Sequence, residues 1–141
     1  MNILRQNSDY ALRAMVNLAE RYGGQVVSTR QLSEEEEVAY PFMAKIMQKL
    51  AAAGLVTSQM GPHGGFALAR APEKISLLDV VGAVQGDVTL NACFMPGHQC
   101  PRRPKCPISR RIAGLQQQIV AYLENTTLAD VLSADNGEDL R

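Results

Sequence analysis

Several features that mark large protein classes are missing from this sequence of 141 residues. Its 14 lysines and arginines are balanced by 14 acidic residues, so the formal net charge is zero. That balance excludes a simple polybasic nucleic-acid or membrane binder, but not a local basic face. No apolar run approaches the roughly 20 residues of a membrane span, and the N-terminus lacks a signal-peptide core. We therefore expect a cytoplasmic protein that does not enter a membrane.

Catalytic motifs are missing as well. The sequence has no P-loop, no HExxH motif and no pairing of a nucleophile with a base. Its two histidines, His63 and His98, lie in loops rich in glycine and proline, without a partner pattern. The sequence therefore predicts a protein that is not an enzyme.

Cysteine is scarce, and its placement is informative. There are 3 cysteines, an odd number, and all of them lie between Cys93 and Cys106. Such clustering in a cytosolic chain indicates metal or redox chemistry rather than a disulfide scaffold.

The first half of the chain predicts a helix-turn-helix. A helix over 8–22 ends at two glycines, and Ser28 opens a Ser-x-x-Gln capping box that predicts a helix of seven or eight residues. Pro41 suits the first turn of a third helix, which ends at Gly54. The buried stripe of that helix comprises Met43, Ile46, Met47 and Leu50. Two short helices, the second with a basic outer face, are typical of a helix-turn-helix.

A hairpin is predicted directly after these helices. Two extended runs, 55–60 and 66–70, flank the turn sequence 61–65, which is rich in glycine and proline. After a recognition helix, such a hairpin is interpreted as a wing, and its glycines allow a close approach to phosphate. An ordinary surface hairpin is the alternative.

The second half predicts two further helices. Residues 76–79 cap the first, which ends at Gly86, and 87–107 are irregular. The second helix carries a heptad-like stripe formed by Ile108, Ile112, Leu115, Ile119 and Tyr122. This stripe either packs on the chain's own core or pairs with a second subunit, and we favour pairing. We expect 134–141 to be frayed.

Four features together resemble one known family. They are the segment 8–13, the segment 53–56, the wing sequence 61–65 and the cysteine loop before a long helix. In this order and spacing they resemble the Rrf2 family of bacterial transcription regulators, including the IscR and NsrR types, over residue 1 to about residue 132. The resemblance implies a winged-helix homodimer, crossed by its long helices, that binds a palindromic operator in double-stranded DNA. It also implies that three cysteines hold an iron–sulfur cluster that sets DNA affinity.

The expected fold is therefore mainly α: a winged helix-turn-helix with a small β-hairpin wing and a long C-terminal dimerisation helix. The expected division is a DNA-binding domain at 1–86 and a cluster-binding loop at 87–107. The dimerisation helix and a C-terminal turn occupy 108–132, and a flexible tail occupies 133–141.

The cysteine loop has the spacing Cys93-x6-Cys100-x5-Cys106. Thiolates suit iron–sulfur clusters, zinc or copper, but structural zinc usually has cysteine pairs two to four residues apart. The wider gaps favour a cluster, and the surrounding arginines and lysines would offset its negative charge. Zinc, or three unligated and redox-active cysteines, are the alternatives.

A cluster with three cysteines needs a fourth ligand. The IscR type uses a histidine three residues after the last cysteine, and Ser109 occupies that position here. The NsrR type uses an aspartate near the start of the first helix, reaching across the dimer, and Asp9 matches it. Asp9 could equally stabilise the helix dipole, and His98 is a third candidate. The resemblance favours a 4Fe–4S cluster over a 2Fe–2S cluster.

The expected DNA contacts come from three segments. Free N–H groups at the start of the second helix can bind phosphate, and side chains of the third helix can reach base edges. Phe42 could instead lie in the core. In the family the wing often carries an arginine where this chain has Met60, and IscR-type members carry a glutamate where it has Ala44. The residues expected to contact DNA are Ser28, Thr29, Arg30, Tyr40, Pro41, Phe42, Lys45, Gln48, Lys49, His63 and Gly64.

The run Glu34–Glu37 is expected to form a solvated face. The predicted function is that of a dimeric DNA-binding regulator, a repressor or an activator, whose cluster senses redox state, iron supply or nitric oxide. A cluster-free regulator that responds to a small molecule, a partner protein or cysteine oxidation is the first alternative. An iron–sulfur carrier or redox protein is the second.

Overall fold

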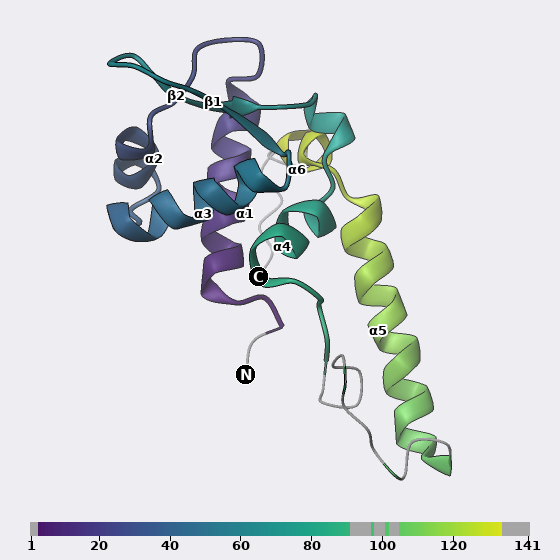
Figure 1. The fold of residues 1–141 in the computed structure, drawn as a ribbon. Coiled ribbons are helices and arrows are strands. Elements are labelled where there is room, and N and C mark those ends of the chain that lie inside the picture. The colour runs from purple at the N-terminus through teal and green to yellow at the C-terminus, as the bar shows by residue number, and fades with distance from the viewer. Residues whose placement is uncertain (1–2, 91–96, 98–100, 102–104, 134–141) are drawn as a thin grey trace.

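The computed structural model describes residues 3–90, 97, 101 and 105–133. Within this part of the chain, helices dominate and the only sheet is one antiparallel hairpin (Figure 1). In chain order the elements are α1 (Gln6–Glu20), α2 (Thr29–Glu35), α3 (Tyr40–Ala52), β1 (Val56–Gln59), β2 (Gly65–Leu68), η1 (Pro72–Lys74), α4 (Leu77–Gln85), α5 (Pro107–Asn125) and α6 (Leu128–Ser133).

Helix α1 forms the centre of the main core. It packs against α3 and β2 and also against α4 and α6, so it joins the two halves of the fold (Figure 1). Its residues Ala11, Ala14 and Met15 have no exposed surface. Because two of these three side chains are alanines, neighbouring helices can approach the α1 backbone closely.

The predicted helix-turn-helix is confirmed. Ser28 is the N-cap of α2, and its hydroxyl accepts a hydrogen bond from the backbone N–H of Gln31 at 3.0 Å. The Gln31 side chain does not complete the capping box but donates to Glu35 at 3.3 Å. Pro41 lies in the first turn of α3, whose predicted stripe is buried at all four positions, Met43, Ile46, Met47 and Leu50.

The wing is a short antiparallel hairpin. Its register pairs Val56 with Leu68 and Gln59 with Gly65. Gly61 begins the turn with φ at 109°, a backbone conformation that side chains other than glycine rarely adopt. The N–H of Gly64 closes the turn by donating to the carbonyl of Gly61 at 3.0 Å.

The C-terminal helices return to the same core. Ser76 and Asp79 form a complete capping box at the start of α4, as the sequence predicts. The backbone N–H of Leu128 donates to the carbonyl of Ile75 at 3.0 Å, and Leu128 is fully buried. Helix α6 therefore packs into the same core as α1, although about 120 residues separate the starts of the two helices.

The stripe predicted on α5 lies within an arc of about 80° around the helix, but its residues differ in burial. Ile119 packs against a second small cluster that contains Val81, Val88 and Leu123, so this side faces the chain's own body. Ile108, Leu115 and Tyr122 are exposed, with exposed fractions of 69%, 46% and 69%. One edge of the stripe therefore packs on the chain's own body, while the adjacent edge, at steps of seven residues, has no cover within the described chain. Pairing of that uncovered edge with a second subunit stays a prediction.

These elements confirm the expected fold class, a mainly α winged helix with a β-hairpin wing and a long C-terminal helix. Across the residues that the structure describes, no helix is both long enough and apolar enough to cross a membrane. The frayed tail predicted for 134–141 lies outside those residues.

Candidate nucleic-acid interface

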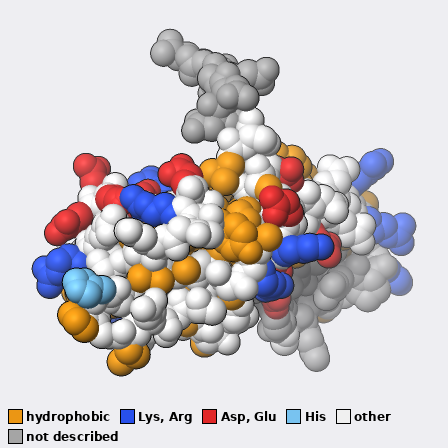
Figure 2. Space-filling view, turned by 90° about the horizontal axis from the view of Figure 1, so that it is seen from above, with side chains coloured by type: hydrophobic (Ala, Val, Ile, Leu, Met, Phe, Trp, Pro, Cys, Tyr) orange, Lys and Arg blue, Asp and Glu red, His pale blue; other side chains and the backbone are white. Residues whose placement is uncertain are grey.

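A hollow of about 420 Å³ opens where α2, α3 and the wing meet. Five residues predicted to contact DNA line it: Ser28, Thr29, Arg30, Tyr40 and Gly64. They come from three segments that are separated in sequence by up to 36 residues and that the fold brings to one surface. Acidic and basic side chains are interspersed on the face that Figure 2 shows, consistent with the zero net charge.

Arg30 supplies the positive charge of the hollow. Its guanidinium carbon lies 5.6 Å from the centre of the Tyr40 ring. This distance suits a cation–π interaction, which orients the guanidinium without neutralising it. The contact also joins the first turn of α2 to the first turn of α3.

The wing is fixed against the start of α2. The N–H of Val27 donates to the carbonyl of Phe66 at 2.9 Å, and the N–H of Phe66 donates back to the carbonyl of Val27 at 2.8 Å. Gly65 allows this approach, because a Cβ atom at that position would lie 2.8 Å from the backbone nitrogen of Ser28 and would collide with Val27. The wing and the N-terminal end of α2 are therefore held together.

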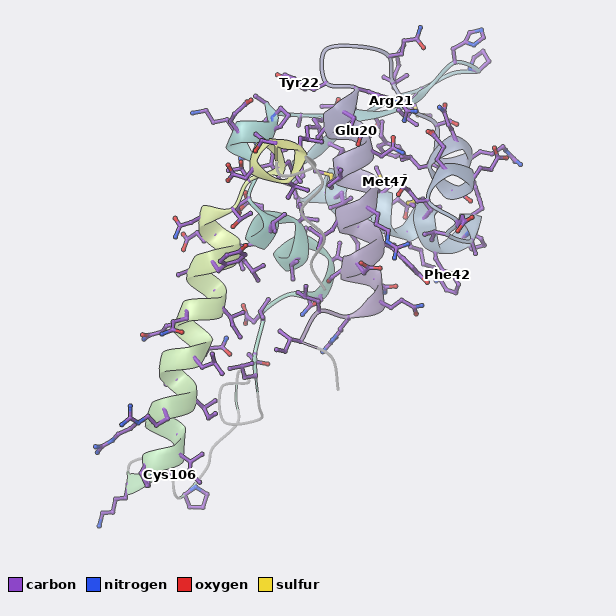
Figure 3. The ribbon with its side chains drawn as sticks, turned by 180° about the vertical axis from the view of Figure 1, so that it is seen from behind. Glu20, Arg21, Tyr22, Phe42, Met47 and Cys106 are labelled. Atoms are coloured by element: carbon purple, nitrogen blue, oxygen red, sulfur yellow. The ribbon has the colours of Figure 1, made fainter. Side chains whose placement is uncertain are left out.

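The outer side of α3 presents the remaining predicted contacts. Pro41, Lys45 and Gln48 are exposed, and Phe42 keeps 56% of its surface exposed (Figure 3). The alternative that places Phe42 in the core is therefore wrong. Lys49 has an additional contact, because its ammonium group lies 3.4 Å from the carbonyl of Val84 near the end of α4.

A polar network fixes α2 on α1. The guanidinium of Arg21 binds both carboxylate oxygens of Glu35, at 2.6 and 3.0 Å, and also donates to the amide oxygen of Asn17. Asn17 in turn donates to Glu36 at 2.8 Å. Three members of the acidic run, Glu34, Glu35 and Glu37, are exposed as expected, but Glu35 and the half-buried Glu36 also bind Arg21 and Asn17. Figure 3 shows Arg21 at the end of α1 nearest this network.

The ion pair changes the pKa of both partners. The hydrogen bond from Arg21 is the main reason that the pKa of Glu35 lies below its usual value, and Gln31 adds a second hydrogen bond. The same bond raises the pKa of Arg21, against a smaller opposing effect of burial. Both groups therefore stay charged at neutral pH, and the α1–α2 contact persists there.

The wing contributes residues that the sequence analysis did not select. Ser58, Gln59 and Met60 line the hollow beside Arg30. Only Val56 of β1 is buried, so the rest of that strand is exposed. The sequence does predict that these residues are exposed, because a polar run between the core residue Val56 and a glycine turn is typical of an exposed strand end.

The predicted metal ligands are only partly described. Cys106 is the N-cap of α5 and is half-buried, whereas Cys93, Cys100 and His98 lie outside the described residues. Figure 3 shows Cys106 at the end of α5 that is remote from the helical body. Within the described ranges, no group of three histidine, cysteine or acidic residues could hold a metal ion.

The candidate fourth ligand does not meet Cys106 within one chain. Asp9 lies in the first turn of α1, and its carboxylate pairs with Arg13 at 3.0 Å. Cys106 stands away from that turn, at the far end of α5 (Figures 1 and 3). His63 is exposed at the tip of the wing, and Ser109 is buried on α5.

The fold and the hollow define a winged helix-turn-helix protein. Residues 4–134 match the sequence profile of the Rrf2 family, described as iron-dependent transcriptional regulators. The chain belongs to this family and is a transcriptional regulator.

Individual relatives agree with this assignment. The chain is 31% identical over 129 residues to the transcriptional regulator IscR of Cereibacter sphaeroides, covering 87% of this chain and 82% of that protein. It is 29% identical to the transcriptional regulator NsrR of Halalkalibacterium halodurans, covering 94% and 92%. The structure of CymR, the global cysteine regulator of B. subtilis, superposes with a TM-score of 0.77 at 21% identity, covering 96% of this chain and 100% of that one.

Proposed function

We propose that two copies of this chain bind a palindromic operator in double-stranded DNA and that an iron–sulfur cluster sets their affinity. The hollow carries the DNA part of this proposal, because five predicted contact residues from three segments line it. Free N–H groups at the start of α2 and the Arg30 guanidinium suit phosphate. The exposed side chains of α3, including Phe42 and Gln48, suit base edges in the major groove.

The cluster part depends on the chemistry of the proposed ligands. Thiolates of Cys93, Cys100 and Cys106 are soft ligands that suit iron–sulfur clusters, and the family is described as iron-dependent. Because Cys106 lies far from the first turn of α1, which carries Asp9, the Asp9 carboxylate would come from the second copy. When bound, such a cluster supplies an iron centre that is sensitive to redox state, iron supply or nitric oxide. The 4Fe–4S type is favoured over 2Fe–2S.

Cys106 connects the cluster site to the rest of the fold. It occupies the N-cap position of α5, directly before Pro107, and the far end of α5 packs on α4. A change at the cysteines would therefore reach the winged domains through α5.

A second hollow favours the cluster-free alternative. It measures about 350 Å³ and lies between α1, α4 and α6, with an apolar wall that includes Leu12, Val16, Leu77 and Val131. Arg13, Glu20 and Glu36 line its rim. A small molecule with an apolar body and a charged end suits this lining. Metal content separates the two candidates.

The test of the cluster is the metal content of full-length protein purified without oxygen. We expect a brown protein with iron and acid-labile sulfide in equal amounts and no zinc. Cys106→Ser and Asp9→Ala should lose the colour, and His98→Ala should keep it. Arg13→Ala is the matched control for Asp9, because it breaks the 3.0 Å ion pair but leaves the carboxylate. A colourless, metal-free protein with three intact thiols would contradict the cluster.

The test of the DNA surface is the salt dependence of binding. Arg30→Ala should weaken binding to selected duplexes and reduce the slope of log affinity against log salt by about one, because one phosphate contact is lost. Lys74→Ala in η1 removes one exposed positive charge outside the hollow and should leave that slope unchanged. Equal effects of the two substitutions would show that the hollow is not the DNA surface.

A further inference from the structure

The wing of this protein carries no charge. From Val56 to Leu68 there is no lysine, arginine, aspartate or glutamate. The wing tip consists of Met60, Gly61, Pro62 and His63, and all four residues are exposed. A wing of this composition cannot hold itself on DNA by ion pairs with phosphate.

The side chain of Met60 is almost fully exposed to solvent. It keeps 91% of its surface exposed, more than any other large hydrophobic side chain in the described part of the chain. It directly follows β1, whose register with β2 ends at the pair Gln59 and Gly65. Its backbone is therefore held in place while its side chain extends into solvent. Leaving a large apolar side chain in water forgoes the free energy of burying it.

The location of Met60 indicates what would cover it. Met60 lines the same hollow as Ser28, Thr29 and Arg30, the positive side of which suits a phosphate backbone. Because Val27 and Phe66 bond to each other, the wing keeps a fixed position relative to α2. DNA that binds at the start of α2 must therefore pass the wing tip. When α3 lies in a major groove, the groove next to it is a minor groove.

We propose that the Met60 side chain inserts between two base pairs from the minor groove and kinks the DNA there. This inference rests on the proposed DNA binding. Methionine and proline are among the apolar side chains that act as such wedges, and Pro62 lies on the same turn. The wedge selects sites by their deformability, so a flexible pyrimidine–purine step is favoured beneath the wing.

The experiment uses the full chain, purified without oxygen, and a 40-base-pair duplex selected from a random pool. Bending is measured by the gel mobility of circularly permuted fragments. Unstacking is measured by the fluorescence of 2-aminopurine placed at each step of the site. Wild-type protein should bend the duplex and raise the fluorescence at one step.

Three variants of one exposed residue separate a wedge from a simple contact. Met60→Ala should abolish both the bend and the fluorescence rise and weaken binding about tenfold, with the salt slope unchanged because no charge is lost. Met60→Leu keeps an apolar wedge and should keep both signals. Met60→Arg should lose the fluorescence rise and steepen the salt slope by about one. Circular dichroism checks the fold of each variant.

The outcomes also distinguish this inference from the proposed function. If a duplex is selected but Met60→Ala still bends it and still raises the fluorescence, the wedge is wrong and DNA binding stands. If the pool yields no duplex, both proposals are wrong.

Discussion

At the scale of single residues, Gly65 controls the relation between the wing and α2. Its backbone lies so close to Val27 and Ser28 that no Cβ atom fits. The obstacle is backbone rather than a flexible side chain, so the wing itself must move to admit a larger residue. A single added methyl group at this position should therefore disturb the hollow.

Gly65→Ala should therefore reduce stability by about 1–3 kcal/mol, as overpacked sites do. The measurement is the midpoint of urea unfolding with an unchanged slope. Gly82→Ala is the matched control, because a Cβ atom there meets nothing within 4 Å and the site is helical. That control should gain about 0.5–1 kcal/mol. Equal effects at the two sites would contradict the close approach.

Prediction from sequence succeeded for residues whose role is local. Ser28 and Ser76 cap their helices, and Pro41 opens α3, because each of these roles depends on neighbours within four positions. It failed where a partner is distant in sequence. The bonds from Arg21 to Glu35 and from Lys49 to Val84 span 14 and 35 residues. The first pair meets because α2 lies beside the end of α1, and the second because α3 packs on α4.

At the scale of elements, the Arg21–Glu35 pair makes the contact between α1 and α2 depend on pH. The pKa of Glu35 is lowered in the folded protein, so the ionised carboxylate stabilises the fold above its ordinary pKa near 4.5. That stabilisation is lost as the pH falls through the lowered pKa. Both side chains are about one-third exposed, so water and salt weaken the pair.

Glu35→Gln should therefore cost less than about 1 kcal/mol at pH 7, and the difference from wild type should shrink as the pH falls from 4.5 towards 3. Urea unfolding at pH 7 and pH 3, with and without added salt, measures this. Glu34→Gln, which changes an exposed neighbouring residue, is the control and should have little effect at pH 7. A difference between wild type and Glu35→Gln that is as large at pH 3 as at pH 7 would show that the ion pair is not its cause.

The sequence predicts where the helices lie more reliably than which face of each helix is buried and against what. The spacing 43, 46, 47 and 50 identified the buried face of α3 because that helix packs on one core. The spacing on α5 identified one arc of the helix whose two edges differ in cover, since Ile119 packs on α4 while Leu115 and Tyr122 are exposed. A periodic pattern shows that a helix is amphipathic, but not which of two partners covers each side.

At the scale of the whole molecule, the exposed residues of α5 predict a second copy. Ile108, Leu115 and Tyr122 recur every seven residues, the repeat of a helix–helix seam. Leu115→Glu should shift the protein towards monomer in sedimentation at micromolar concentration, because the charge would be buried between the two copies. DNA affinity should fall with it, since a palindromic operator needs both copies.

Gln117→Glu places the same charge on α5 and is the control. It is also exposed, but it lies about 200° around the helix from Leu115. It should leave the sedimentation and DNA affinity unchanged. A Leu115→Glu protein that remains dimeric would exclude this seam as the contact between copies.

The length of α5 has a mechanical consequence. The helix has 19 residues, and Leu123, near its C-terminal end, is buried in the body, whereas Cys106 begins the opposite end. Its span is about 28 Å at 1.5 Å per residue, so a tilt of about 5° at the buried end displaces the other end by about 2.5 Å. Conversely, a displacement of this size at Cys106 produces only a few degrees of rotation near α4. The helix therefore acts as a lever that reduces a large movement at the cysteine to a fine adjustment in the body.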